Sequence, residues 1–188
     1  MNIKSLSATL IMLAAFTIMT ACGMRDRQAE DFTEPELALI HESDSIMRVL
    51  TIDAPSDLAV LRSLSYDLSD STLLSDDFKR LTELMVATVT HPSQDGVGIA
   101  GPQVGLNRRV IAVQRFDKEG EPFEVYPNVR ILWASDSLAT GPEGCLSVPD
   151  RRGDVLRSQE IVIEYADITG IEHSLQQNRL ESKICDNL

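Results

Sequence analysis

Two short segments decide how this chain is interpreted: Gly141-Pro142-Glu143-Gly144-Cys145-Leu146-Ser147-Val148-Pro149 and, upstream of it, Gly96-Val97-Gly98-Ile99-Ala100-Gly101-Pro102-Gln103. The upstream segment is rich in glycine, and residues without a Cβ let main-chain groups line a cleft directly. The amide of Gln103 can donate a hydrogen bond to a developing oxyanion. Together the segments indicate a ligand-binding cleft that carries an amide and a cysteine.

The glycine spacing also matches a dinucleotide-binding fingerprint, with Gly96, Gly98 and Gly101 at the expected intervals. That fingerprint comes after a buried strand and opens a helix. Here a helical pattern and the polar loop 91–95 come first, and Pro102 interrupts the stretch where the helix would begin. Close backbone approach to an extended ligand therefore explains the glycines better than nucleotide binding does.

The composition is that of one globular domain. The chain has 188 residues, of which 43% are hydrophobic and 5% aromatic, so its length suits a single core. We expect that core to rest on Leu, Ile, Val and Met, with four larger side chains: Phe78, Phe116, Phe123 and Trp133. The net charge of -12, from 29 acidic and 17 basic residues, argues against nucleic acid as a partner.

The first residues are typical of an export signal. Lys4 supplies a positive start, and the apolar run 6–19 is too short to cross a bilayer comfortably. Met19-Thr20-Ala21-Cys22 resembles a bacterial lipobox, in which the cysteine is lipid-modified after cleavage. We therefore predict a signal peptide over residues 1–21, a lipidated Cys22 and a membrane-anchored lipoprotein of the bacterial cell envelope, on its periplasmic or surface side. An uncleaved signal anchor and a wrongly chosen start codon are the alternatives.

Beyond the signal, the sequence divides into an acidic tether over residues 22–45 and a folded domain over residues 46–188. Within the tether, Thr33-Glu34-Pro35 favours the start of a short helix. Residues 58–62 are predicted to be a loop or turn.

The clearest helix runs over residues 76–89, because apolar residues recur there at helical spacing after a favourable start at Ser75. It ends before Pro92. Strand signals come next, at 109–115, 123–126, 129–133 and 160–165, with turns at 117–120, 135–137, 150–154 and 167–170. A helix and then a series of strands predict an α+β domain in which antiparallel strands pack around a central helix.

The two quoted segments resemble the first two active-site motifs of the peptide deformylases. The first motif of that family runs Gly-x-Gly-x-Ala-Ala-x-Gln, and Gly101 stands in place of its second alanine. Four residues fall in register with it: Gly96, Gly98, Ala100 and Gln103. Residues 143–147 match the second motif. The resemblance covers roughly residues 47–184 and implies the α+β fold of that family.

The resemblance also implies an activity, the metal-dependent hydrolysis of the N-formyl group from N-formylmethionyl peptides. Cys145 would be a thiolate ligand of Fe(II) or Zn(II), and the Gln103 amide and the Leu146 N–H would hold the substrate carbonyl oxygen. The remaining substrate-binding residues would be Gly96, Gly98, Glu143 and Gly144. The structural alternative for Cys145 is a buried cysteine on a strand beside a tight turn.

The third motif of the family, a helical His-Glu-x-x-His that supplies two metal ligands, has no match. The histidines are His41, His91 and His173, and none has a second histidine four residues away. His41 falls in the short N-terminal helix, His91 at a helix end and His173 in a hairpin. Residues 180–185 resemble the opening of the motif's helix, and 186–188 then end the sequence. We expect this C-terminal metal-binding helix to be missing or incomplete, as in a truncated member, and the family reaction to be impaired.

Cysteine usage leaves a further alternative. If Cys22 is acylated, Cys145 and Cys185 remain, and a disulfide between them would use up the metal ligand. Two unpaired thiols are the simpler expectation. Three hypotheses stay open: a metalloamidase whose other ligands come from elsewhere or from a longer natural chain, a non-catalytic peptide-binding remnant of the same fold, and a degenerate product without a stable fold.

Overall fold

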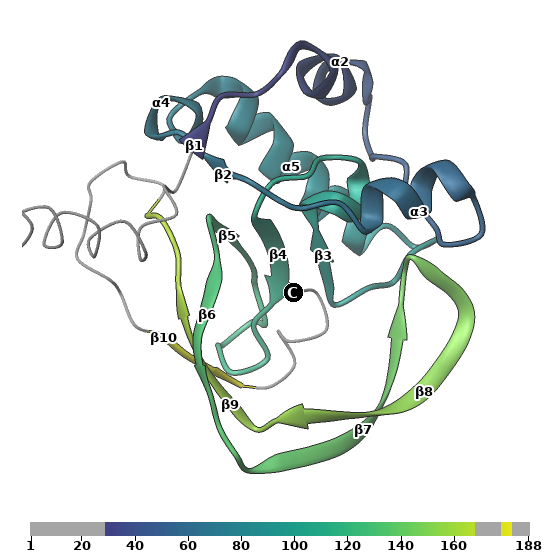
Figure 1. Cartoon of the computed structure of the whole chain (residues 1–188), viewed down its shortest axis with the longest axis vertical. Helices are drawn as coiled ribbons and strands as arrows, with labels where there is room; N and C mark the ends of the chain where they lie inside the picture. The colour runs from purple at the N-terminus through teal and green to yellow at the C-terminus, as the bar shows by residue number, and fades with distance from the viewer. Residues whose placement is uncertain (1–28, 168–177, 182–188) are drawn as a thin grey trace, which may run out of the picture.

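The computed structural model describes residues 29–167 and 178–181 (Figure 1). Its helices are α2 (Glu34–Glu42), α3 (Pro55–Leu61), α4 (Asp70–Leu73), α5 (Asp76–Thr90) and the 3-10 helix η1 (Gly101–Val104). Its strands are β1 (Ala29–Glu30), β2 (Asp67–Leu68), β3 (Gly98–Ala100), β4 (Val110–Gln114), β5 (Phe123–Pro127), β6 (Arg130–Ala134), β7 (Leu138–Cys145), β8 (Val148–Ser158), β9 (Glu160–Glu164) and β10 (Asn178–Glu181). The helices gather on one side and the longer strands on the other.

Antiparallel strands form three separate sheets. Their orders are β3-β4-β5, β10-β9-β6 and the two-stranded hairpin β7-β8, while the short strands β1 and β2 pair in parallel. Helix α5 packs against β3 and β4. The predicted α+β fold is therefore confirmed, and the four predicted strands are confirmed as β4, β5, β6 and β9. Residues 180–185 are predicted from the sequence to open the C-terminal helix, but residues 180 and 181 belong to β10, so that part of the prediction is wrong. Residues 182–188 lie outside the described part.

Helix α5 follows from its own residues. The Oγ of Ser75 accepts the Phe78 N–H at 3.1 Å, which caps the first turn. Apolar side chains at helical spacing are buried: Phe78, Leu81, Leu84, Met85 and Val89. The helix ends at Thr90, since Pro92 keeps the residue before it out of the helical region. The helix predicted over residues 76–89 is confirmed.

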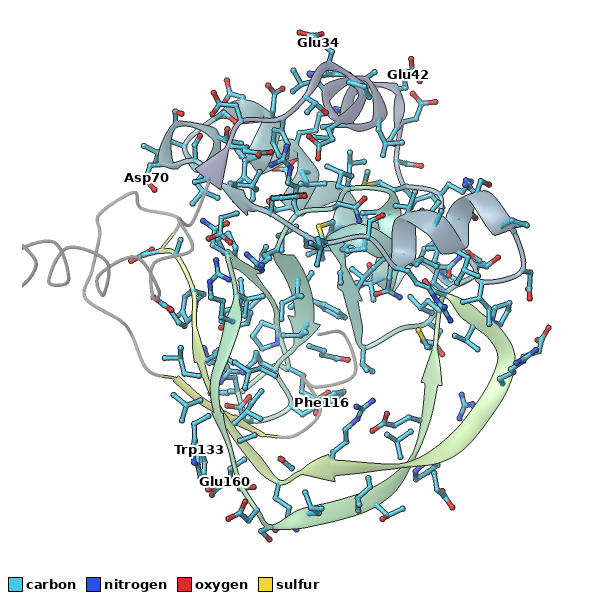
Figure 2. All side chains as sticks on the ribbon, viewed as in Figure 1. Glu34, Glu42, Asp70, Phe116, Trp133 and Glu160 are labelled. Atoms are coloured by element: carbon cyan, nitrogen blue, oxygen red, sulfur yellow. The ribbon has the colours of Figure 1, made fainter. Side chains whose placement is uncertain are left out.

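The core is mainly aliphatic, as expected, and its fully buried members include Ile40, Leu68, Leu81, Met85, Ile99 and Leu106. Of the four larger side chains expected in it, Phe78 is buried and Phe123 is half-buried. Phe116 and Trp133 are instead 40% and 46% exposed, so the expectation for these two is wrong. Trp133 lies at the outer margin of the sheet, on edge strand β6 beside a bulge, and Phe116 follows β4 in a turn (Figure 2).

The loop predicted at residues 58–62 is wrong, because most of it lies in α3. Pro55 occupies the start of that helix, where its missing N–H costs no hydrogen bond. Seven residues are too few to display a helical repeat in the sequence.

The turn predicted at residues 150–154 is also wrong, because these residues lie inside β8. The chain reverses instead at Leu146 and Ser147. The turn-like residues coincide with a break in the pairing register of the hairpin. Gly144 pairs with Arg152, whereas Cys145 pairs with Val148. Asp150 takes a left-handed φ of +59° in that break.

Part of the expected tether over residues 22–45 folds onto the domain. Ile40 of α2 is fully buried. Arg108, itself 3% exposed, donates to both carboxylate oxygens of Glu36 at 2.7 Å. The predicted short helix is thus confirmed as α2, and residues 29–42 contribute to the core.

Several predictions fall outside the described residues: the signal peptide over residues 1–21, the lipidation site Cys22, His173, Cys185 and most of the turn at 167–170. Among the described residues, no helix combines the length and the apolar character that crossing a membrane requires.

Candidate functional site

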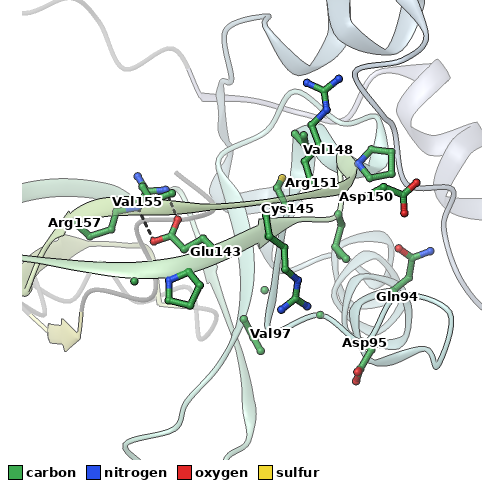
Figure 3. Close-up of a pocket in the computed structure, with 18 of the residues that line it drawn as sticks. Gln94, Asp95, Val97, Glu143, Cys145, Val148, Asp150, Arg151, Val155 and Arg157 are labelled. Atoms are coloured by element: carbon green, nitrogen blue, oxygen red, sulfur yellow. Dashed lines mark hydrogen bonds and ion pairs between the residues drawn. The ribbon is translucent and has the colours of Figure 1, made fainter.

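A cavity of about 1040 Å³ lies between the hairpin β7-β8 and the loop that follows α5 (Figure 3). Residues 93–98 form one wall, and both strands of the hairpin form the other. Among the residues singled out in the sequence, these line the cavity: Gly96, Gly98, Glu143, Gly144, Cys145 and Leu146. The two motifs therefore share one site.

The Gln103 side chain links the two motifs. It lies on η1, which Pro102 helps to start, and it is only 7% exposed. Its Oε1 accepts the Ala100 N–H at 2.9 Å. Its Nε2 donates to the Oγ of Ser147 at 3.3 Å and to the Sγ of Cys145 at 3.8 Å. Because Ala100 engages the amide oxygen, the NH₂ group is directed at the second motif.

Close packing accounts for two glycines of the upstream segment 96–103. A Cβ on Gly101 would lie 2.7 Å from the carbonyl oxygen of Arg108, closer than real Cβ atoms approach. A Cβ on Gly96 would lie 2.9 Å from Cγ2 of Val89 and 3.1 Å from Cδ1 of Leu146. The leucine of the second motif can pack against the end of α5 because position 96 has no side chain.

Cys145 and Leu146 lie at the tip of the hairpin. Strand β7 ends at Cys145, Leu146 and Ser147 form a two-residue turn, and β8 starts at Val148. Cys145 is exposed, whereas Ser147 is 4% exposed with the Gln103 amide as its partner. The alternative of a buried cysteine is therefore wrong, although the strand and tight turn that it assumed are present.

Glu143 and Gly144 lie on the hairpin wall of the cavity. The Glu143 carboxylate accepts hydrogen bonds from Arg157 across the hairpin, at 3.1 Å to Nε and 2.8 Å to Nη2 (Figure 3). This ion pair ties β7 to β8. A Cβ on Gly144 would lie 3.6 Å from Cγ of Arg152, an ordinary contact, so packing alone does not demand a glycine there.

Two contributors to the site were not predicted from the sequence. Ser147 lies inside a quoted motif, but the structure is needed to place its hydroxyl beside the Gln103 amide. Residues 50–52 lie outside both motifs, and their backbone bonds to the backbones of Gln103 and Ser147. Backbone hydrogen bonds depend little on side-chain identity, so no residue pattern marks this segment in the sequence.

The metal site implied by the resemblance is not complete in the described part of the chain. Among side chains described there, no three His, Cys, Asp or Glu are placed to hold a metal ion. His41 pairs with Asp77 at 2.9 Å, and Nδ1 of His91 lies 2.8 Å from Oγ of Ser93. A catalytic site needs about three protein ligands. Cys145 offers one thiolate, so these residues do not fit a catalytic metal by themselves.

A family model described as Polypeptide deformylase matches residues 46–186. The match includes both motifs and begins after α2, so β1 and α2 precede it. A peptide deformylase of Leptospira biflexa serovar Patoc is 36% identical over 136 residues, which cover 69% of this chain and 73% of that protein.

Two solved structures of class I type b peptide deformylase from Acinetobacter baumannii are also similar. The actinonin-bound structure has a TM-score of 0.61 and 28% identity, and the match covers 74% of this chain and 85% of that one. The structure bound to Met-Ala-Ser has a TM-score of 0.61 and 28% identity, with coverage of 73% and 85%.

Proposed function

Since the chain belongs to the peptide deformylase family, we propose that its cavity recognises N-formylmethionyl peptides, the substrates of that family. The observation that carries the proposal is the contact between the Gln103 amide and Cys145, 42 residues apart in the sequence, at the edge of the cavity. The similar structure that holds Met-Ala-Ser supports a peptide as the ligand.

In this proposal, Gln103 and Leu146 recognise the formyl group. The Nε2 of Gln103 is already directed at the tip of the hairpin, and the Leu146 N–H follows Cys145 in the turn. Two preorganised donors stabilise a carbonyl oxygen most strongly where negative charge develops on it. A formylated peptide should therefore bind more tightly than the same peptide with a free amine.

The family reaction depends on a metal ion, and we propose Fe(II) or Zn(II) because the Cys145 thiolate is a soft ligand. The described side chains place no second and third ligand beside it. We therefore expect hydrolysis of the formyl group to be impaired in the 188-residue chain. Recognition depends on Gln103 and Leu146 and should persist.

A non-catalytic peptide-binding protein of the same fold is the second candidate. It is favoured by a cavity with a glycine-lined wall and with Cys145 in contact with the Gln103 amide, while the described residues offer a single thiolate. Under this candidate the chain binds peptides and releases no formate, whatever metal is supplied.

The test is a calorimetric titration with N-formyl-Met-Ala-Ser and with Met-Ala-Ser, alongside formate release with and without added Fe(II) or Zn(II). We expect the formylated peptide to bind more tightly and Gln103→Ala to remove most of that preference. Gln159→Ala is the matched control, because its exposed amide lies outside the cavity. Equal affinity for the two peptides would refute formyl recognition. Rapid formate release would refute the impairment.

We also propose that residues 1–21 direct export and that Cys22 is lipid-modified, which would tether the domain to the membrane of the bacterial cell envelope. The support is the apolar run 6–19 and the lipobox-like end of the signal after it. Labelling of bacteria with a fatty-acid analogue should mark the wild type and Cys145→Ala but not Cys22→Ala. A label retained in Cys22→Ala would contradict the anchor.

A further inference from the structure

A short segment between α2 and α3 joins the two halves of the site through its backbone. The Leu50 N–H donates to the Gln103 carbonyl oxygen at 2.8 Å. Two residues later, the Ile52 N–H donates to the Ser147 carbonyl oxygen at 2.9 Å. Gln103 lies on η1, between β3 and β4 of one sheet, whereas Ser147 lies in the turn of the separate hairpin β7-β8. We call residues 50–52 the bridging segment.

Asp57 holds the middle of the bridging segment. Its Oδ2 accepts the Thr51 N–H at 3.2 Å. Its two carboxylate oxygens also accept the Arg48 guanidinium, at 2.7 and 2.8 Å. The Asp57 side chain is 5% exposed while that of Arg48 is 67% exposed. The guanidinium keeps the pKa of Asp57 below its usual range, so this carboxylate is ionised at neutral pH.

The carboxylate also connects the bridging segment to a second support. Asp57 lies on the first turn of α3, and α3 packs against η1, the helix that carries Gln103. The buried Asp57 carboxylate therefore fixes the bridging segment relative to the first motif. The Ile52 N–H then links the bridging segment to Ser147 of the second motif.

We propose that Asp57 is a positioning residue that, through the bridging segment, holds the Gln103 amide at a fixed spacing from the hairpin tip with Cys145 and Leu146. The inference rests on the proposed function, because formyl recognition is the activity that this spacing would serve. Hydrogen bonds weaken steeply when the donor shifts in distance or angle, so a displaced Gln103 amide would hold the formyl oxygen less well. Loosening the bridging segment should therefore be measurable as lost affinity.

The test compares Asp57→Ala, Asp57→Asn and Asp67→Asn in the full chain. The first removes the acceptor of the Thr51 N–H, and the second restores an oxygen acceptor of the same size without the charge. Asp67 provides the matched control. Its carboxylate is 8% exposed and pairs with Arg109 and Arg130, which lie outside both motifs.

Calorimetric titration with N-formyl-Met-Ala-Ser measures the affinity, and thermal unfolding measures the stability. We expect Asp57→Ala to weaken binding about tenfold, or about 1.4 kcal/mol. Asp57→Asn should recover most of the affinity, and Asp67→Asn should lower the melting temperature without weakening binding. If Asp57→Ala and Asp67→Asn lose affinity alike, in proportion to their loss of stability, Asp57 has a structural role only and the inference is overturned.

Amide hydrogen exchange separates this failure from a failure of the proposed function. If the wild type does not prefer the formylated peptide, the proposed function is wrong, and exchange at Leu50 and Ile52 then decides the inference. Faster exchange at both amides in Asp57→Ala, but not in Asp67→Asn, supports it, and unchanged exchange overturns it. If Asp57→Ala does not fold, Arg48→Ala replaces it with the same two outcomes, because it leaves the carboxylate without its bidentate partner.

Discussion

The conformation of Gly105 governs how the turn that carries Gln103 ends. Gly105 closes η1 with a φ of +92°, and a Cβ there would lie 3.0 Å from Cδ2 of Leu39. A side chain in the left-handed region costs about 1–2 kcal/mol. We predict that Gly105→Ala lowers the melting temperature, by about 2–4 °C for each kcal/mol lost. Calorimetry of the purified variant measures this.

The control for this prediction is Gly153→Ala in β8. An added Cβ at that position meets no atom within 4 Å, and no positive φ accompanies it. The variant should melt at the wild-type temperature or slightly above it. Equal destabilisation by the two substitutions would mean that the left-handed turn is not what Gly105 provides.

Residues of the site differ in how far the sequence could predict them. Gln103 and Cys145 follow from the resemblance, and the structure brings their side chains to 3.8 Å. Asp57 was not predictable, because its role depends on the Thr51 N–H, and any residue but proline offers an N–H there. In the sequence, a carboxylate near a helix start indicates only an ordinary favourable charge.

Secondary-structure elements divide in a similar way. Helix α5 is marked by apolar residues that recur at helical spacing and are buried. Strand β4 is marked by a continuous run of buried apolar residues. The hairpin β7-β8 contains Gly, Pro, Asp and Arg at many positions and is exposed on most of its length. Strand propensity is low for several of these residues. Its strands are held by mutual pairing and the ion pair of Glu143 with Arg157, which periodicity does not reveal.

Substitutions in helix α2 can show whether residues 29–42, which precede the family match, stabilise the fold. Ile40 is completely buried in the core between α2 and its neighbours. Cutting a buried isoleucine to alanine costs about 2–5 kcal/mol. We predict that Ile40→Ala lowers the urea midpoint strongly while Glu42→Ala, exposed on the same helix (Figure 2), leaves it nearly unchanged. If both variants unfold like the wild type, residues 29–42 act as a tether after all.

The turn between β4 and β5 should confer acid sensitivity. Hydrogen bonds from Arg115 lower the pKa of Asp117 from 3.8 to about 2. Since the folded pKa lies below the unfolded value, the Asp117 carboxylate stabilises the fold at neutral pH. That contribution is lost as the pH falls from about 4 toward about 2. We predict that Asp117→Asn is less stable than the wild type at neutral pH and that the gap narrows on acidification.

Urea unfolding at a series of pH values measures this gap. Asp154→Asn is the control, because that exposed carboxylate lies on β8, away from Arg115. A gap for Asp117→Asn that stays constant down to about pH 2.5 would show that the ion pair does not link stability to this proton.

For the whole molecule, the number of metal ligands is the quantity to measure. The described residues offer a single thiolate, and one thiolate with solvent does not provide the affinity of a three-ligand site. We predict that the dialysed 188-residue chain holds far less than stoichiometric Fe, Ni or Zn by elemental analysis. Stoichiometric metal would contradict this and would direct attention to ligands outside the described residues.

An extended protein provides the reciprocal experiment. A family-type segment with His-Glu-x-x-His, added after Ile184, should restore metal binding and formyl-peptide hydrolysis. In that protein Cys145→Ala should abolish the metal site, whereas Gln103→Ala should spare it and lower turnover by about 10²–10³, the usual scale for one oxyanion donor. Metal binding without formate release would refute the deformylase activity.

The hairpin β7-β8 is held by the rest of the fold at both its base and its tip. At its base the hairpin continues into the paired strands β6 and β9, and at its tip the Ile52 N–H donates to the Ser147 carbonyl oxygen at 2.9 Å. Between these supports, an added Cβ on Gly141 or Gly153 would meet no atom within 4 Å. We therefore expect the middle of the hairpin to be the part of the cavity wall that shifts most easily when a ligand binds. We expect the size of the peptide that the cavity accepts to depend on how easily this hairpin bends, more than on the size of any one side chain.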